Sequence, residues 1–240
     1  MWLLLWSVVG LPVAGQQTTE PPKRKFDPPR IVAVFRPPDT GMQGQQSSLF
    51  YINKGQESNL NRGEELNVYR EVPVPGMERP LRIFIGTMTI LESQSGSSVG
   101  GFRANPGLDQ TVVRYKAAMK GDIVVPRLII DSGVLFDPGK SELKSGVAQE
   151  FEKVATFVQN FSPNKLIIEG HTDADGDDAS NQLLSDSRAG VVRQYLITAY
   201  NFITPAMIEA RGYGERQPIV SNDTPENKAL NRRIEVVVWE

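Results

Sequence analysis

The chain has 240 residues, of which 40% are hydrophobic, and a formal net charge of -2, as is typical of one or two globular domains. This near-neutral balance excludes a bulk attraction to nucleic acid or anionic lipid. The absence of cysteine excludes disulfides, thiolate metal sites and a lipidated cysteine anchor. The charge is divided, however, with +4 over residues 16–127 and -6 over residues 128–240, which favours two modules with different surfaces.

The first fifteen residues are apolar and uncharged, and they are too few to span a bilayer, which requires about 20 apolar residues. Small side chains at 13–15 precede Gln16, as they would at a signal-peptidase site, so we predict a signal peptide over residues 1–15 and export. A buried N-terminal strand is the alternative. The polar, proline-containing stretch that follows and the apolar run 31–35 predict a linker and an N-terminal strand over residues 16–48.

Residues 49–127 consist of short apolar runs separated by clusters of Gly, Pro and Asn. This pattern is typical of small all-β barrels, in which short strands follow one another through tight turns. The predicted strands lie at 49–52, 66–69, 82–85, 87–91 and 111–115.

Within this region, turn and strand signals recur in a fixed order at 52–55, 60–68, 85–86 and 120–124. The order resembles the small SH3-like β-barrel at the C-terminus of the flagellar assembly protein T family. Glu64 stands where that family usually has Asp, and residues 72–79 form a long insert. The resemblance implies a barrel module that contacts an envelope or flagellar motor protein.

The C-terminal part alternates strand and helix signals. Strands are predicted at 128–130, 166–168, 208–213 and 234–239, with residues 132–137 leading from the first strand into a turn. One helix is predicted from about Ser141, with Val147, Phe151, Val154 and Val158 on one face. A second is predicted over about 182–200, burying Leu184, Val191, Val192, Tyr195, Leu196 and Ala199. These elements predict an α/β sandwich, a mixed sheet with helices on one face, and the whole chain is predicted to be α+β.

Two charged residues stand fifteen positions apart in this part of the chain. Asp173 follows a predicted strand, and Arg188 lies in the predicted helix after it. A strand-to-helix crossover brings the carboxylate and the guanidinium to the same mouth. That pair suits a ligand that carries both an ammonium and a carboxylate, as a free amino-acid end does.

The segments around these residues, 167–173, 184–189, 212–218 and 231–234, form a recognisable pattern. The stretch 128–240 resembles the OmpA-like peptidoglycan-binding domain of outer-membrane proteins, Pal lipoproteins and flagellar motor proteins. The resemblance implies that Asp173 and Arg188 hold the zwitterionic end of meso-diaminopimelate in the peptide stem. Arg188 would offer a planar donor fork to the carboxylate, and Asp173 would accept from the ammonium. The alternative is a plain ion pair worth at most about 1 kcal/mol.

Further site residues follow from the same resemblance. Thr172 and Asn181 match positions that line the pocket with polar groups, and Arg232 matches a residue that reaches the ligand from the last strand. Phe136 and Asp137 begin the loop whose backbone contacts the stem. For the Asp137 side chain a structural role in capping the turn is favoured, and for Arg233 a structural salt bridge.

Catalytic and metal sites find little support. His171 is the only histidine and cysteine is absent, so no triad assembles around a second base, and we expect His171 to be hydrogen-bonded in the core. The acidic stretch 173–178 fails the EF-hand pattern, with Asp178 at the sixth position and Leu184 at the twelfth. We therefore predict no enzyme, metal or cofactor, although a Ser/Asp dyad or a carboxylate pair stays open.

The sequence thus predicts an exported protein that binds peptidoglycan stems without catalysis and anchors an envelope complex to the cell wall, as a flagellar motor accessory component. It would lie in the periplasm, associated with the cell wall or the outer membrane. The alternatives are a general tether between the envelope and the wall and an enzyme acting on peptidoglycan. No nucleic-acid partner is expected, and a homo-oligomer is compatible with the sequence.

Overall fold

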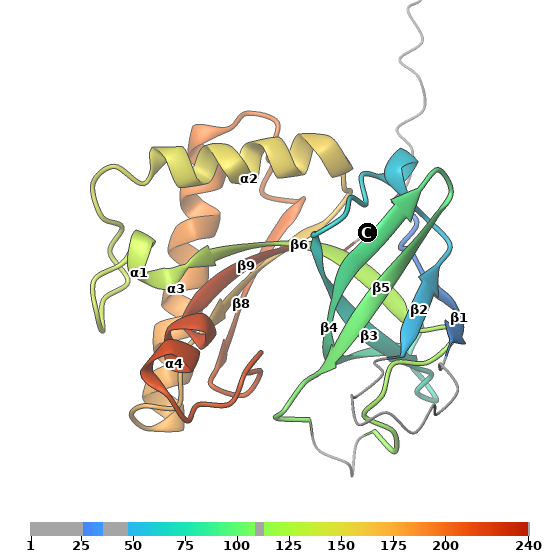
Figure 1. The fold of residues 1–240 in the computed structure, drawn as a ribbon. Helices are drawn as coiled ribbons and strands as arrows, with labels where there is room; N and C mark the ends of the chain where they lie inside the picture. Colours follow the sequence, from blue (N-terminus) through green and yellow to red (C-terminus); the bar gives the residue numbers. More distant parts are fainter. Residues whose placement is uncertain (1–25, 36–47, 109–112, 240) are drawn as a thin grey trace, which may run out of the picture.

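The computed structural model describes residues 26–35, 48–108 and 113–239, and one sheet runs through this part of the chain (Figure 1). Its strand order is β1-β2-β5-β4-β3-β6-β9-β7-β8. The strands are β1 Ile31–Phe35, β2 Leu49–Ile52, β3 Glu65–Val72, β4 Leu81–Gln94, β5 Ser97–Ala104, β6 Ile123–Asp131, β7 Leu166–His171, β8 Ile208–Gly214 and β9 Arg233–Val238. The helices are η1 Gln56–Ser58, α1 Ser132–Leu135, α2 Ala148–Phe161, α3 Asp178–Ala199 and α4 Pro225–Asn231.

The C-terminal half confirms the predicted α/β sandwich. Strands β6, β9 and β7 pair antiparallel, whereas β7 and β8 are parallel because α3 crosses between them. Helices α2 and α3 pack together on one face of this sheet, and Phe151 of α2 stacks on Tyr195 of α3 with ring centroids 4.2 Å apart (Figure 1). Phe151, Val154 and Val158 are buried on the predicted face of α2, whereas Ala199 of α3, predicted to be buried, is exposed.

Several predicted boundaries in this half are wrong for local reasons. Helix α2 begins at Ala148 and not near Ser141, because Gly146 has a φ of +86°, where a right-handed helix cannot continue. The segment from Ser132 forms the short helix α1, capped by Asp131, whose side chain accepts from the Gly133 N–H at 2.7 Å. Helix α4 was not predicted, although Pro225 at its start is a common opening signal.

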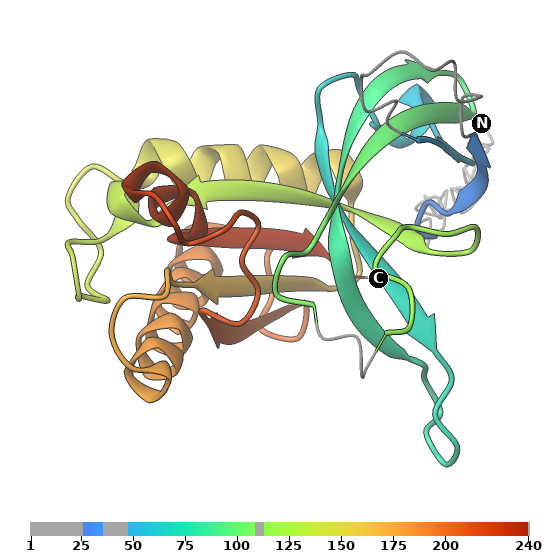
Figure 2. The ribbon, with the colours of Figure 1, turned by 60° about the horizontal axis from the view of Figure 1, so that its bottom comes forward.

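The N-terminal half is a curled sheet of β1, β2, β5, β4, β3 and the first part of β6 (Figure 2). The curl closes where Arg30 bridges Ile123, and the Ile31 N–H donates to the Asp122 carbonyl at 3.0 Å. It encloses a core of its own, which includes Ile31, Phe50, Ile52, Leu60, Leu66, Val68, Ile85, Met88, Ile90 and Val124. The likeness of residues 49–127 to an SH3-like barrel stays a prediction.

The strands of this half differ from the predicted runs. The runs 82–85 and 87–91 form the single strand β4, which passes through Gly86 with a shift of register. Strand β5 was not predicted because it is rich in Ser and Gly. The run 111–115 lies partly outside the described residues, and its described part, 113–115, is not a strand.

Strand β6 joins the two halves. Ile123–Pro126 pairs with β3, and Arg127–Asp131 pairs with β9, so the predicted boundary between residues 127 and 128 falls inside one strand. Tyr69 and Phe84, from the N-terminal half, belong to the C-terminal core. The division into modules therefore stays a proposal, and the signal peptide and most of the 16–48 linker lie outside the described residues.

The outer edge of β8 is occupied by side chains of α3. The Gly212 N–H donates to Asp186 Oδ1 at 2.7 Å, and the Gly212 carbonyl accepts from Gln182 Nε2 at 2.8 Å. The Ile208 carbonyl accepts from Arg193 Nε at 2.8 Å. Within the described residues, no helix combines the length and apolarity needed to cross a membrane.

Candidate functional site

The site lies where β7 ends and the loop to α3 begins. Two glycines let α3 lie close against the sheet at this point, which brings Arg188 to the end of β7. A Cβ on Gly170 would stand 2.3 Å from the Ser185 carbonyl oxygen, and one on Gly212 would stand 2.3 Å from the Asp186 nitrogen. No side chain fits at such distances, so the glycines determine how closely α3 approaches the sheet.

Asp173 is buried, with 7% of its surface exposed. Its Oδ2 forms an ion pair with Arg232 Nη1, and its Oδ1 accepts from the Asp175 N–H at 3.2 Å. The Arg232 side chain is 44% exposed. Asp173 therefore pairs with Arg232 rather than with Arg188, and the arginine that covers it stands at the solvent-facing side of the site.

Arg188 is also buried, more deeply than its predicted position at a mouth implies. Its Nε donates to the Lys140 carbonyl at 2.8 Å and its Nη2 to the Asp137 carbonyl at 3.2 Å. Its guanidinium lies 5.1 Å from the centroid of the Phe136 ring, a cation–π arrangement. Burial, and then the charge of Arg232, lower the pKa of Arg188, while Asp173 opposes this shift.

The remaining predicted residues are gathered around this pair. Thr172 is buried, and its Oγ1 has no hydrogen-bond partner among the described residues. The Nδ2 of Asn181 donates to the Asp173 and Asp175 carbonyls at 3.3 and 3.1 Å, so Asn181 fixes the loop after β7. Phe136 is buried beneath the Arg188 guanidinium.

Asp137 contributes through its backbone. Its carbonyl accepts from Arg188, whereas its exposed carboxylate lies 3.7 Å from Lys140 Nζ and 3.6 Å from Lys144 Nζ. The Lys140 N–H donates to the same Asp137 carbonyl at 3.0 Å and closes the turn. The structure thus brings all seven predicted residues to one end of the sheet, Asp137 by its main chain.

Sequence reasoning assigned no role to two residues that support the site. Asn231 is fully buried, and its Nδ2 donates to the Val220 carbonyl at 2.9 Å and to Asn222 Oδ1 at 2.9 Å. Glu215 Oε2 accepts from Asn181 Nδ2 at 2.8 Å. Both residues stand inside the motif segments quoted above, so the signal was present, but their contacts depend on loops far apart in sequence.

A buried charge network lies on the sheet face opposite α3. Glu235 Oε1 accepts from Arg233 Nε at 2.6 Å and from Arg127 Nη1 at 2.8 Å. Burial, and then the charge of Glu235, raise the pKa of Glu169 to about 8. Burial would also raise the pKa of Glu235, but Arg127 and Arg233 outweigh it and hold that pKa low. The predicted salt bridge of Arg233 is therefore present.

His171 belongs to the same network but not as predicted. Its ring stacks on Tyr213 with centroids 5.4 Å apart, and neither ring nitrogen forms a hydrogen bond among the described residues. Burial lowers its pKa well below the usual value, so the ring is neutral. Glu169, His171 and Glu235 lie close enough to surround an ion, but the two guanidiniums on Glu235 already supply the positive charge that a metal would bring.

Three of the four carboxylates in the acidic stretch 173–178 have partners within the protein, and the first is Asp173, which pairs with Arg232. Asp175 Oδ1 lies 2.6 Å from Lys228 Nζ, and Asp177 Oδ1 caps α3 by accepting from the Ser180 N–H at 2.9 Å. These contacts account for the acidic loop without a calcium ion.

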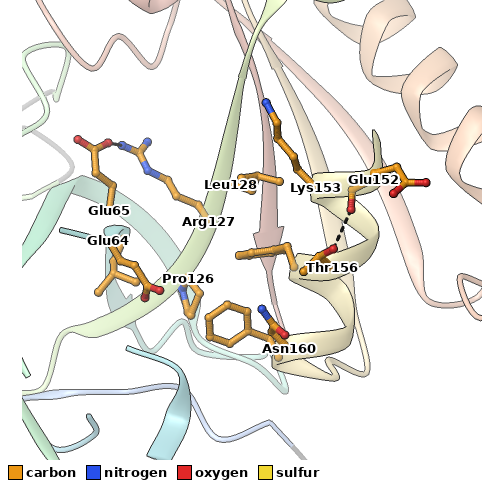
Figure 3. A pocket seen from close by; sticks show the side chains of 12 residues that line it. Glu64, Glu65, Pro126, Arg127, Leu128, Glu152, Lys153, Thr156 and Asn160 are labelled. Atoms are coloured by element: carbon orange, nitrogen blue, oxygen red, sulfur yellow. Dashed lines mark hydrogen bonds and ion pairs between the residues drawn. The ribbon is translucent and has the colours of Figure 1, made fainter. Parts of the chain in front are cut away.

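A separate groove of about 460 Å³ lies at the joint of the two halves (Figure 3). Leu66, Pro126, Leu128, Phe157 and Phe161 form its apolar part. The Glu65 and Arg127 side chains point toward each other across its β3 side, with Oε2 and Nη2 2.8 Å apart (Figure 3). None of the seven predicted site residues lines this groove.

Comparison with known proteins identifies the family. Residues 135–232 match the OmpA family. The chain is 39% identical over 105 residues to outer membrane porin F of Pseudomonas aeruginosa, a match that covers 44% of this chain but only 30% of the porin. It is 33% identical over 133 residues to outer membrane protein A of Bordetella avium, covering 55% of this chain and 68% of that protein.

Matches among solved structures were also found. The cell wall anchor of the T6SS from Pseudomonas aeruginosa is 21% identical, with a TM-score of 0.43, and the match covers 48% of this chain and 81% of that one. The periplasmic domain of Helicobacter pylori MotB is 24% identical, with a TM-score of 0.41, covering 48% and 79%. With residues 135–232 matched and two thirds of the Bordetella protein covered, the chain belongs to the OmpA family.

Proposed function

We propose that the chain binds the peptide stems of peptidoglycan and anchors an envelope complex to the cell wall, without catalysing a reaction. The observation that carries this proposal is the meeting of Asp173 and Arg188, both buried, at one end of an OmpA-family domain. Several of its relatives are named as outer membrane proteins, and the chain is accordingly a protein of the periplasm, associated with the cell wall or the outer membrane.

The finer proposal is that the ligand is the zwitterionic end of diaminopimelate. Its carboxylate would bind Arg188, whose Nε and Nη2 are held by backbone carbonyls and whose Nη1 has no hydrogen bond among the described residues. Its ammonium would bind Asp173. The Thr172 hydroxyl, buried without a partner, supplies a further donor or acceptor at the same place.

Binding at Asp173 requires an exchange of partners. The carboxylate is covered by Arg232 in the free protein, so an incoming ammonium must take the place of the Arg232 guanidinium. This exchange is feasible because the Arg232 side chain is nearly half exposed and can rotate into solvent. The displaced guanidinium then lies beside the ligand and can pair with its carboxylate.

Sedimentation with purified sacculi tests the proposal. The full chain should sediment with sacculi, whereas Asp173→Asn and Arg188→Lys should remain in solution. Asp178→Asn is the matched control, since Asp178 is exposed in the first turn of α3, beside the site, and it should sediment like the parent. Equal binding of a folded Arg188→Lys protein would overturn the proposal.

Two further arms address the finer claims. Sacculi with lysine in place of diaminopimelate should bind the protein more weakly if the second ammonium–carboxylate end is the ligand. If the protein instead releases soluble fragments from sacculi, it is an enzyme. A role as a flagellar accessory component rests on the resemblance of residues 49–127. Localisation at basal bodies would support it, and a uniform envelope distribution would favour a general tether.

A further inference from the structure

The strongest unassigned feature is a hollow of about 520 Å³ on the N-terminal half. It is formed by the end of β3, the residue before β1 and the loop that leads into β6. Four cationic side chains and two carboxylates line it: Arg30, Arg70, Arg114, Lys120, Glu71 and Asp122. We call this set, with the apolar side chains that border it, the basic face.

Both carboxylates of the basic face are already engaged by arginines. Asp122 is buried and accepts from Arg70 Nε at 3.0 Å and from Arg70 Nη2 at 2.8 Å. Glu71 is shared between Arg30, at 3.0 Å, and Arg82, at 3.1 Å. The acidic side chains are thus fully matched, and the remaining cations set the local charge.

The unmatched cations are held on an ordered loop. Arg70 Nη1 and Nη2 donate to the Tyr115 and Ala117 carbonyls at 2.8 and 2.9 Å, which fastens this loop to β3. Arg114 and Lys120 are exposed on it, and neither forms an ion pair within the described part of the chain. The Arg114 guanidinium lies 5.4 Å from the Tyr115 ring centroid, so the two groups present a joint cationic and aromatic surface.

Exposed apolar side chains border these cations. Tyr115 and Met119 line the hollow and are 55% and 42% exposed. Val72, which also lines it, begins the turn between β3 and β4, and that turn projects from the curled sheet (Figure 2) and carries the exposed Met77. Cations mixed with exposed aromatic and aliphatic tips are the composition that binds the headgroup region of an anionic bilayer.

We propose that the basic face docks on an anionic membrane surface through phosphate-bearing lipid headgroups. Arg114 and Lys120 would attract the phosphates, and Tyr115 and Met119 would enter the headgroup layer. An acidic protein partner would satisfy the cations as well, and binding to such a partner instead of vesicles is an outcome of the test below. The charge division of the chain, +4 before residue 128 and -6 after it, is consistent with a membrane-facing half joined to a half that faces away.

Vesicle co-sedimentation with the full chain tests this proposal. We expect binding to vesicles of phosphatidylcholine with phosphatidylglycerol and none to phosphatidylcholine alone. The double variant Arg114→Gln/Lys120→Gln should bind the anionic vesicles about 30-fold more weakly, at roughly fivefold per surface cation. The control Lys153→Gln/Lys165→Gln removes the same charge from the C-terminal half and should bind like the parent.

Further arms separate the membrane from other ligands. Tyr115→Ser/Met119→Ser should weaken vesicle binding with no change of charge, which a purely ionic site would not show. All these proteins share one N-terminus, so any contribution of residues 1–15 is common to them. Equal binding by the Arg114/Lys120 variant would overturn the proposal. So would displacement by inorganic phosphate beyond that caused by NaCl of equal ionic strength, or retention on an acidic peptide without vesicle binding.

Discussion

The two proposed binding regions, one in each half of the molecule, hold their charges in opposite ways. At the proposed site in the C-terminal half the charges are buried and satisfied from within, as Asp173 is by Arg232 and Arg188 by two backbone carbonyls. In the N-terminal half Arg114 and Lys120 lie exposed on a loop. A buried, pre-positioned charge recognises one small group by geometry, whereas exposed cations attract an extended anionic surface. Binding by the C-terminal half should therefore vary little with salt concentration, and binding by the N-terminal half should weaken as salt concentration rises.

The sharpest way to break this comparison is to separate the halves. Tyr69, Phe84, Ile123 and Val125 are buried in the C-terminal core, so a fragment of residues 26–131 would expose them. Burial of each large apolar side chain contributes about 1.5–3 kcal/mol, so the fragment should unfold at a much lower denaturant concentration than the full chain. Equal midpoints in urea would show that the joint contributes no stability.

The same experiment tests the module boundaries. A fragment of residues 49–127 also lacks Arg30 and Ile31, which close the curled sheet against Ile123 and Asp122. We expect it to be less stable than the 26–131 fragment. Neither fragment should sediment with sacculi, since none of the seven residues of the proposed site is present in it.

Removing Arg188 tests the buried site. Arg188→Ala leaves the ligand carboxylate unpaired, which typically costs about 2–5 kcal/mol, or roughly 30-fold to several-thousand-fold in affinity. It also leaves the Lys140 and Asp137 carbonyls without their donor, so the melting temperature should fall as well. Arg188→Lys, which keeps the charge but not the fork, separates the two effects. If it bound sacculi normally, the proposed binding site would be wrong.

The buried network predicts a pH dependence of stability. The pKa of Glu169 is raised from 4.5 to about 8 in the folded protein, so its contribution to stability is complete below pH 4.5 and is lost as the pH rises through 8. The lowered pKa of His171 acts oppositely, costing stability as the pH falls below 6.5. Between pH 6.5 and 8 the free energy of unfolding should therefore fall by about 2 kcal/mol.

Glu169→Gln is the control for this window. The amide cannot ionise, so the free energy of unfolding should fall less between pH 6.5 and 8 than it does in the parent. Urea unfolding at several pH values measures this difference. Arg127, Arg211, Arg233 and Glu235 surround this position and keep their charges in that range. An unchanged slope in the variant would show that another group titrates there.

The smallest expected effect concerns Arg232. Because its side chain is nearly half exposed, Arg232→Gln should weaken sacculus binding by about fivefold at most, in line with the usual worth of an exposed ion pair. The loss should be larger at low salt than at high salt, whereas the loss from Arg188→Lys should vary little with salt. Isothermal titration with a diaminopimelate-containing peptide, at low and at high salt, measures the loss of affinity for each variant. A loss as large as that of Arg188→Lys would contradict the view that Arg232 is a displaceable cover.

The sequence was most informative where a short motif and an apolar period coincide. The run ending at Asp173 and the helix containing Arg188 predicted both the C-terminal fold and the site, because crossover geometry leaves few arrangements. The pairing of Asp173 with Arg232 could not be predicted, since it depends on how α4 and the loop before it fold. The lack of hydrogen bonds at the His171 ring nitrogens could not be predicted either, because hydrogen bonds in a core depend on neighbouring strands.

The joint shows a different limit. Pro126 reads as a break, since it has no N–H to donate to a neighbouring strand, and the charge also changes sign nearby. Yet β6 continues through Pro126, which is the residue where pairing passes from β3 to β9. Likewise β5 escaped prediction because two serines and two glycines outnumber Val99 and Phe102 in it. Gly100 is required there for packing, since a Cβ on it would stand 2.5 Å from Met88 Cγ.

The α3 side chains along β8 affect how readily the protein would aggregate at high concentration. An edge strand with unpaired backbone groups can pair with a strand of another molecule, and such pairing is a common route to aggregation. Here Asp186, Gln182 and Arg193 occupy backbone groups of β8, and at the other end of the sheet β1 is closed against the start of β6. Within the described residues, both edge strands of the sheet are thus partly covered, and we expect that loosening α3 would expose the β8 edge to strand pairing between molecules.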